Sequence, residues 1–314
     1  MRKGSMSLLF ALVFLVANNA ILNAQRRSGN TVKIEVAQEK NIAVGPKLVV
    51  GIVVDQMRYD YLTRFWDQYG EGGFRRLVND GFNCRNNHFN YAPTYTAPGH
   101  ASVYTGTSPA IHGIIGNDWY DKFQDREVYC AGDDTYVSIG TVSDAGKMSP
   151  HRMESTTMTD QLRLHTQMRG KVIAVALKDR GAVLPGGHMA NAAYWFEGGD
   201  KGNWISSSYY MDDLPQWVKE FNAARSIDQY KKPWTTLKNI NTYRESGPDN
   251  TPYEGLPKGK PEPTFPYDLR ALWDNNGKYS ILMGTPYGNS LTTDFALEAL
   301  EKEALERDSI TDFL

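Results

Sequence analysis

Several polar side chains stand where the sequence changes from one kind of predicted element to the next. They are Asp55, Thr96, Asn117, Lys178 and Arg180. Thr96 opens a predicted helix, where a hydroxyl faces unpaired backbone N–H groups and the positive end of the helix dipole. That setting favours both an alkoxide and a bound phosphate. Threonine needs a base or a metal to act as a nucleophile, and Asp55 is a candidate metal ligand. The pair indicates metal-assisted phosphoryl or sulfuryl transfer.

Each of these residues also has an ordinary structural interpretation. Asp55 and Thr96 could each cap a helix, and Asn117 lies in a turn-like run where asparagine is common. Lys178 and Arg180 could belong to a solvated loop. They could equally bind a phosphate at the end of a strand, Arg as a fork and Lys as a point charge. All these residues follow predicted strands or open predicted helices, so one edge of a sheet could gather them.

The histidines and cysteines near these positions leave several alternatives open. His100 and His112 could serve as bases or ligands, although neither has a histidine partner four positions on, and a hydrogen-bonded structural role is favoured for each. Cys84 and Cys130 are the two cysteines, and neither belongs to a CxxC pair, which excludes a zinc knuckle. In an exported protein they either form a disulfide or remain free thiols.

The elements expected to position these residues alternate between strands and helices. The apolar, β-branched run 47–55 predicts a strand buried on both faces, as in a parallel sheet. Further strands are predicted at 171–177, 194–197, 204–210 and 310–314, and helices at 59–69, 72–79, 96–106, 154–168, 214–224 and 291–305. Ser155 is the expected cap of the 154–168 helix. This alternation indicates an α/β fold with a largely parallel sheet.

The N-terminus has the pattern of a secretory signal. Arg2 and Lys3 precede an apolar run at 8–17, and small residues lead to Ala24. A membrane span needs roughly 20 apolar residues, so the run is too short for one, and cleavage is expected after Ala24. We therefore expect a periplasmic or secreted protein with no stable membrane anchor after cleavage, the alternative being a retained anchor.

Composition divides the rest of the chain. We expect a signal peptide at 1–24, a polar linker at 25–46, an α/β core at 47–225, an inserted cap region rich in Pro and Gly at 226–289, and a return to the core at 290–314. With 34 Lys and Arg against 36 Asp and Glu, the net charge is −2. Nothing in that balance favours nucleic acid as a partner.

Four motifs together resemble the alkaline phosphatase superfamily. They are VVDQMR at 53–58, TYTAPGHAS at 94–102, HGIIGN at 112–117 and LKDRGA at 177–182. The resemblance is closest to the exported bacterial alkaline phosphatases that use a threonine nucleophile and are related to nucleotide pyrophosphatases/phosphodiesterases. It runs from about residue 47 to the C-terminus. It implies a three-layer α/β sandwich with a mostly parallel central sheet, incomplete in this chain, plus an inserted cap region.

The resemblance also implies a two-zinc phosphomonoesterase that acts on small phosphoesters. Thr96 would be the nucleophile, forming a phosphothreonine, and a zinc ligand. Asp55 would bind the same zinc, Asn117 would hydrogen-bond a phosphoryl oxygen, and Lys178 and Arg180 would contact the phosphoryl group. A sulfatase is disfavoured, because that branch needs a Cys or Ser nucleophile in a CxPxR-like motif.

One departure limits this interpretation. The family supplies its remaining zinc ligands from downstream Asp- and His-containing segments, including a DxxxH pattern, and none follows Thr311. We therefore expect an N-terminal fragment of a phosphatase that is inactive by itself. Two alternatives remain: a type I phosphodiesterase or nucleotide pyrophosphatase, and an exported ligand-binding protein without catalysis.

Overall fold

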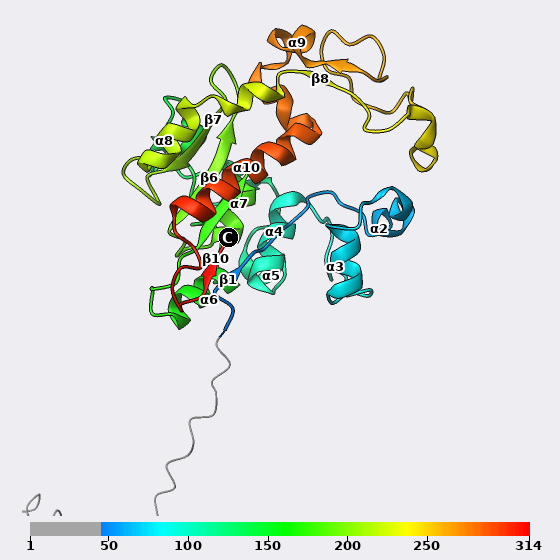
Figure 1. The fold of residues 1–314 in the computed structure, drawn as a ribbon. Coiled ribbons are helices and arrows are strands. Elements are labelled where there is room, and N and C mark those ends of the chain that lie inside the picture. The colour runs from blue at the N-terminus through cyan, green and yellow to red at the C-terminus, as the bar shows by residue number, and fades with distance from the viewer. Residues whose placement is uncertain (1–44) are drawn as a thin grey trace, which may run out of the picture. The chain divides into compact units, whose positions relative to one another are not determined.

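A mixed β-sheet carries helices on both faces in the computed structural model, which describes residues 45–314 (Figure 1). Its strands run in the order β4, β7, β6, β5, and a parallel bridge between Val172 and Phe313 joins this sheet to the pair β10 and β1. The signal peptide expected at 1–24 and residues 25–44 of the expected linker lie outside the described residues, so both remain predictions.

The strands are short, and β6, β7 and β10 carry consecutive buried residues. Their bounds are β1 Leu48–Val49, β2 Asp118–Asp121, β3 Arg126–Tyr129, β4 Ser138–Ile139, β5 Ile173–Ala176, β6 Ala192–Glu197, β7 Asn203–Ser207, β8 Pro233–Trp234, β9 Tyr267–Asp268 and β10 Asp312–Phe313. The predicted hairpin is confirmed, because β6 and β7 pair antiparallel with Trp195 opposite Ile205.

Six of the α-helices correspond to predicted helices with shifted ends, whereas α5, α7 and α9 were not predicted. Their bounds are α2 Tyr61–Arg64, α3 Phe74–Asp80, α4 Thr96–Thr105, α5 Pro109–His112, α6 Met158–His165, α7 Asp179–Gly186, α8 Gln216–Ala223, α9 Leu269–Leu272 and α10 Pro286–Lys302. The cap of α6 is Thr157 and not Ser155, because Thr157 and Asp160 form a reciprocal capping box. None of the helices in the described part of the chain is long and apolar enough to cross a membrane.

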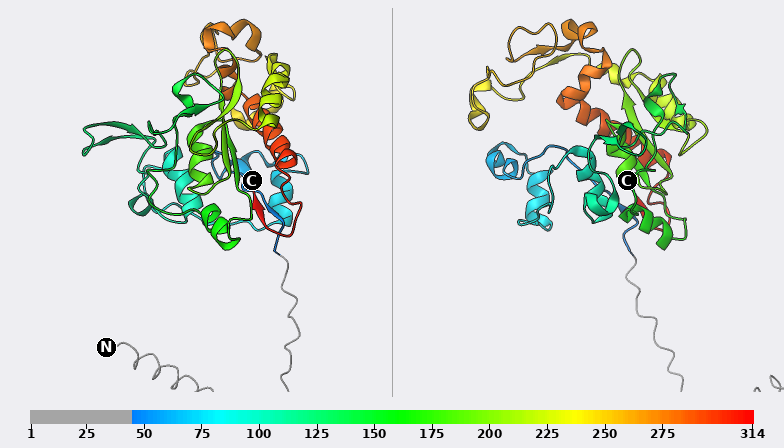
Figure 2. Two further views of the ribbon diagram at one scale, coloured as in Figure 1. Left: turned by 90° about the vertical axis from the view of Figure 1, so that its left-hand side faces the viewer. Right: turned by 180° about the vertical axis from the view of Figure 1, so that it is seen from behind.

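The two faces of the sheet build two hydrophobic cores. Alternate side chains of a strand point to opposite faces, so Tyr194 and Phe196 of β6 pack with α8 and α10. Ala193 and Trp195 of the same strand pack with α4 and α7 on the other face. Figure 2 shows the sheet edge-on between these two helical layers. The predicted three-layer α/β sandwich is confirmed.

The prediction of a mostly parallel central sheet is confirmed, and β7 is the one described strand of this sheet that runs in the opposite direction. β1 with β10 and β5 with β6 are parallel, whereas β7 runs antiparallel to both β6 and β4. A short hairpin loop joins β6 to β7, and such a connection permits only antiparallel neighbours.

The apolar run at 47–55 does not form the expected strand buried on both faces. β1 comprises two of its residues, and the pairing with β10 ends at a hydrogen bond from the Gly51 N–H to the Leu314 carbonyl. Val50, Ile52, Val53 and Val54 are exposed, Ile52 by 78%. An apolar, β-branched composition favours a strand, but it cannot supply the neighbouring strands that bury one.

The region predicted as an inserted cap, 226–289, shares the core of the α8 and α10 face. Its residues Ile227, Leu272 and Leu282 belong to the same buried cluster as Tyr194 and Phe295. Within the region, β8 and β9 pair as a two-stranded antiparallel ribbon.

The side chain of Phe295 is the centre of the larger core. It is fully buried, stacks on Trp204 at 4.2 Å between ring centroids, and meets Tyr194 edge-on at 5.3 Å. We expect Phe295→Ala to lower the free energy of unfolding by about 3–5 kcal/mol, measured by urea denaturation. The fully exposed Phe123 is the matched control, and Phe123→Ala should change stability by less than about 0.5 kcal/mol. Equal effects of the two substitutions would contradict this account of the core.

Candidate active site

Thr96 is the first residue of α4. Tyr95 precedes it with extended backbone and caps the helix without a side-chain hydrogen bond, and Gly106 ends the helix in the left-handed conformation at φ 68°. The Thr96 hydroxyl does not cap the helix but donates to Oδ2 of Asp55 at 3.3 Å. The capping alternative for Thr96 is therefore excluded, and the hydroxyl faces a carboxylate 41 residues away in the sequence.

Among residues 45–314, Asp55 makes no capping or core contact that would explain its position. It is exposed, and its Oδ1 accepts only the N–H of the next residue, Gln56, at 3.1 Å. The following helix, α2, has Asp60 at its N-cap position, so Asp55 does not cap it. Asp55 and Thr96 thus present two accessible oxygens side by side, as a metal ligand pair would.

Asn117 holds the first turn of α4. Its Oδ1 accepts the backbone N–H of Ala97 at 2.9 Å, which satisfies one of the donors that every helix leaves unpaired at its start. Because an N–H can only donate, the acceptor atom must be the amide oxygen. The Asn117 NH₂ group is therefore left to donate elsewhere, as hydrogen bonding to a phosphoryl oxygen requires.

The two predicted cations stand at the start of α7. Lys178 is the exposed residue before the helix, and Arg180 lies in its first turn. A Cβ added at Gly181 would lie 3.0 Å from the Cβ of Ala176 and 4.0 Å from Nε2 of His100. This absence of a side chain lets α7 lie close to β5 and to α4, so the starts of the two helices adjoin.

Tyr129 and Asp179 complete the surroundings of Arg180, and sequence reasoning missed both as functional residues. Nη1 of Arg180 donates to the Tyr129 hydroxyl at 3.0 Å, and this hydroxyl donates to the Asp179 carboxylate. Burial, and then the charge of Asp179, raise the pKa of Tyr129 far above its ordinary value of 10. Asp179 was visible in the sequence between the two cations, but Tyr129 carried no local signal.

The histidines near Thr96 have structural roles. Nδ1 of His100 is 2.9 Å from the carbonyl oxygen of Thr96, to which it can only donate. His112 is fully buried; its Nδ1 accepts the N–H of Ile114 at 3.1 Å, and its Nε2 lies 2.9 Å from the Ser102 hydroxyl. With both nitrogens committed, His112 is not available as a base.

The cysteines are both free in the described residues. Cys84 is exposed and Cys130 is buried. Burial, and then the nearby Asp179, raise the pKa of the Cys130 thiol to about 12, so it does not act as a nucleophile at neutral pH.

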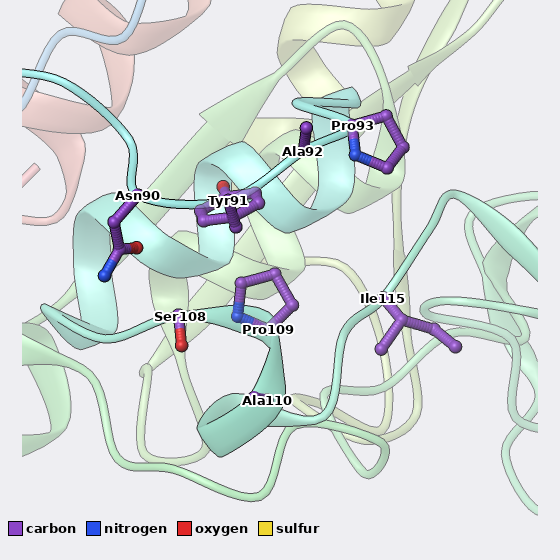
Figure 3. Close-up of a pocket in the computed structure, with 8 residues that line it drawn as sticks. All are labelled: Asn90, Tyr91, Ala92, Pro93, Ser108, Pro109, Ala110 and Ile115. Atoms are coloured by element: carbon purple, nitrogen blue, oxygen red, sulfur yellow. The ribbon is translucent and has the colours of Figure 1, made fainter.

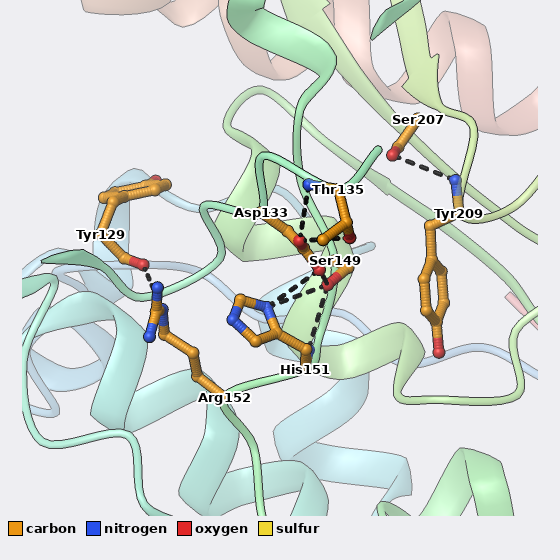
Figure 4. Close-up of polar contacts among 8 residues, drawn as sticks. All are labelled: Tyr129, Asp133, Thr135, Ser149, His151, Arg152, Ser207 and Tyr209. Atoms are coloured by element: carbon orange, nitrogen blue, oxygen red, sulfur yellow. Dashed lines mark hydrogen bonds and ion pairs between the residues drawn. The ribbon is translucent and has the colours of Figure 1, made fainter. Parts of the chain in front are cut away.

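A Ser, His and Asp cluster beside β3 does not form a catalytic triad (Figure 4). Nδ1 of His151 lies 3.1 Å from the Ser149 hydroxyl and 3.2 Å from the Asp133 carboxylate, and Ser149 itself donates to Asp133. A triad uses opposite ring nitrogens for the two partners, and its serine must be accessible, whereas Ser149 is fully buried. The cluster holds its loops together.

A pocket of about 400 Å³ has none of the predicted catalytic side chains in its lining (Figure 3). Tyr91, Pro93, Pro109 and Ile115 are among its lining residues. None of the residues that line it is charged, so it offers no cation to a phosphoryl group.

The part of the chain that the structure describes supplies few metal donors. Within residues 45–314 no three His, Cys, Asp or Glu side chains come together as a metal-binding group. Asp55 and Thr96 together give two oxygens, and a catalytic zinc generally takes three protein ligands. These residues fit one side of a metal site but not a complete one.

This fold, with a hydroxyl and two cations at helix starts and a carboxylate beside the hydroxyl, is that of a phosphoester hydrolase family. The chain belongs to the type I phosphodiesterase / nucleotide pyrophosphatase family, whose model matches residues 49–261. The predicted resemblance to the alkaline phosphatase superfamily is thereby confirmed.

Several relatives are similar over most of this chain. It is 51% identical to a protein named calcium-transporting ATPase from Myroides odoratus, over 86% of this chain and 49% of that one. It is 46% identical to the alkaline phosphatase PhoV of Synechococcus elongatus, over 98% of this chain and 54% of that one. The crystal structure of the alkaline phosphatase PafA matches with a TM-score of 0.83 at 48% identity, over 86% of this chain and 52% of that one. The chain spans about half the length of the relatives it matches.

Burial lowers the pKa of His112 below its ordinary value of 6.5. The unfolded chain therefore takes up this proton at a higher pH than the folded chain does, so protonation favours unfolding. We expect the stability that neutral His112 provides to be present above about pH 6.5 and lost as the pH falls below it. The measurement is the free energy of unfolding between about pH 7.5 and about pH 5.5, where histidine titrates.

His112→Gln should flatten this pH dependence. Burial also lowers the pKa of His151, so His151→Gln should flatten it independently. An unchanged slope in His112→Gln would refute the assignment of a neutral, structural His112.

Proposed function

We propose that this chain carries the nucleophile half of a zinc-dependent alkaline phosphatase that hydrolyses phosphate monoesters. Thr96 attacks the phosphorus, and the phosphoryl group passes from the alcohol of the substrate to the Thr96 oxygen, giving a phosphothreonine that water then hydrolyses. The observation that carries the proposal is the pairing of the Thr96 hydroxyl with the Asp55 carboxylate at the start of α4.

The roles of the other residues follow from their contacts. Asn117 keeps its NH₂ group for a phosphoryl oxygen, since its Oδ1 is bound to α4. Lys178 and Arg180 supply positive charge at the neighbouring start of α7. When bound by Thr96 and Asp55, zinc would supply a Lewis acid that lowers the pKa of the threonine hydroxyl.

Similar proteins support these assignments. A second structure of PafA carries substitutions of a threonine, an asparagine, a lysine and an arginine. The threonine and asparagine there are separated by the same number of positions as Thr96 and Asn117 in this chain, and the lysine and arginine by the same number as Lys178 and Arg180.

A second candidate function is a phosphodiesterase or nucleotide pyrophosphatase, which the description of the matching family names. It would share Thr96 and Asp55. We favour the monoesterase because Lys178 and Arg180 suit a dianion, and because two similar proteins are named alkaline phosphatases. From the predicted signal at 1–24 we also propose a periplasmic or secreted location.

The choice between the two activities can be measured in the chain extended by the C-terminal half of a related alkaline phosphatase, with p-nitrophenyl phosphate and its bis-p-nitrophenyl diester as substrates. We expect Thr96→Ala to abolish both activities, by on the order of 10³-fold or more, and the control Thr96→Ser to retain activity. Lys178→Ala should lower the monoester rate by about 10-fold or more and the diester rate by less, because the diester carries one charge fewer. A diester preference that survives Lys178→Ala would reverse our ranking.

A separate experiment asks whether residues outside this chain complete the metal site. Because the described residues offer two oxygen donors, we expect robust zinc-dependent turnover only when the chain is extended by the C-terminal half of a related alkaline phosphatase. Robust turnover of p-nitrophenyl phosphate by the 314-residue chain with zinc would refute this. Phosphate binding with no turnover in either form would favour a non-catalytic ligand-binding protein.

A further inference from the structure

We propose that Tyr129 and Asp179 are positioning residues that hold the guanidinium of Arg180 in the orientation that binds a phosphoryl group. The inference rests on the proposed function, which assigns Arg180 to that group. It adds two residues, one of them on β3 and far from α7 in the sequence.

The three side chains form a closed hydrogen-bonded loop. Arg180 donates through Nη1 to the Tyr129 hydroxyl at 3.0 Å, and the hydroxyl donates to Oδ1 of Asp179. The same carboxylate oxygen accepts the backbone N–H of Arg180. The directions are fixed, because a guanidinium can only donate and an ionised carboxylate can only accept. A hydroxyl can both accept and donate, so the Tyr129 hydroxyl joins the guanidinium of Arg180 to the carboxylate of Asp179.

The loop leaves donors of Arg180 available. Its Nε is buried and has no hydrogen-bond partner among residues 45–314. A buried donor without a partner is costly, and a phosphoryl oxygen would satisfy it. Arginine binds phosphate best through two parallel N–H groups, which requires the guanidinium plane to be held. Anchoring Nη1 on Tyr129 restrains that plane before the ligand arrives.

The environment keeps the loop in its working protonation state. Burial, followed by the charge of Asp179, raises the pKa of Tyr129, so the phenol stays a neutral donor at physiological pH. Burial raises the pKa of Asp179 as well, and the hydrogen bond from Tyr129 opposes that rise. Tyr129 therefore stabilises the charged partner of Arg180 while it anchors the arginine.

β3 links this loop to the rest of the candidate site. The residue after Tyr129, Cys130, donates its N–H to the Asn117 carbonyl at 2.8 Å, and Asn117 holds the start of α4. Nε of Arg152 donates to the Tyr129 carbonyl at 3.2 Å, which fixes the backbone of Tyr129 from the other side (Figure 4). The hairpin of β2 and β3 therefore supports both Asn117 and Arg180, the two residues proposed to contact the phosphoryl group.

The test combines phosphate affinity with a signal from Arg180 itself. Inorganic phosphate is titrated by calorimetry into the chain extended by the C-terminal half of a related alkaline phosphatase and loaded with zinc. The Nε–H resonance of Arg180, identified by its loss in Arg180→Lys, is followed by NMR. We expect Tyr129→Phe to weaken phosphate binding by about 10-fold and to broaden the Nε–H signal or remove it through exchange with water. Asp179→Asn keeps an acceptor for the Tyr129 hydroxyl. Its phosphate affinity and its Nε–H signal should therefore lie between those of Tyr129→Phe and those of the unsubstituted chain.

A double-mutant cycle separates positioning from general support of the fold. In an Arg180→Ala background, Tyr129→Phe should have no further effect on phosphate affinity. The matched control is Tyr120→Phe, which removes another hydrogen bond from a tyrosine to an aspartate in the same hairpin without touching Arg180. It should change neither measurement.

The outcomes distinguish this inference from the proposed function. Unchanged affinity and an unchanged Nε–H signal in Tyr129→Phe would overturn the inference, as would an equal loss of affinity with and without Arg180. If the unsubstituted chain binds no phosphate but Tyr129→Phe still broadens or removes the Nε–H signal of Arg180, Tyr129 does position Arg180 and the proposed function fails.

Discussion

Close packing of small residues between β5, α4 and α7 determines where the candidate site lies. Ala97 and Ala101 of α4 are fully buried against this layer, and a Cβ at Gly181 of α7 would lie only 3.0 Å from the Cβ of Ala176. Larger side chains would hold the helices apart, because protein interiors cannot absorb extra volume without strain. With the helices close together, the hydroxyl at the start of α4 and the cations at the start of α7 belong to one region. The arginine also comes within reach of β3.

The sequence predicted those parts of the site that depend on local signals. The helix start at Thr96, its end at Gly106 and the cations after β5 all follow from residues near each other in the chain. The correct cap of α6 was also readable, because Thr157 and Asp160 have the spacing of a capping box. The hydrogen-bond partners of these side chains could not be predicted from the sequence. Asn117 lies 20 residues from Ala97, and Tyr129 lies 51 from Arg180, so only the tertiary fold joins them.

The run at 47–55 shows that a strong local signal can also predict burial wrongly. Its composition predicted burial on both faces, but a strand is buried by its neighbours and not by its own residues. β10 pairs with two of its residues, and the apolar side chains from Val50 to Val54 remain exposed in the described structure. The same extended segment ends at Asp55, which is why this carboxylate stands at an open edge beside Thr96 rather than in a core.

The two carboxylates of the site are suited to different partners because their surroundings differ. Oδ1 of Asp179 accepts from both the Tyr129 hydroxyl and the Arg180 N–H, next to two cations. The positive charge of Lys178 and Arg180 disfavours a metal ion there and attracts anions. Asp55 is exposed, and its Oδ2 meets only the Thr96 hydroxyl among the described side chains. A phosphate monoester brings a dianion and an electrophilic phosphorus together. The separation of the exposed Asp55 carboxylate, paired with the threonine hydroxyl, from the two cations is the arrangement that the proposed monoester substrate would require.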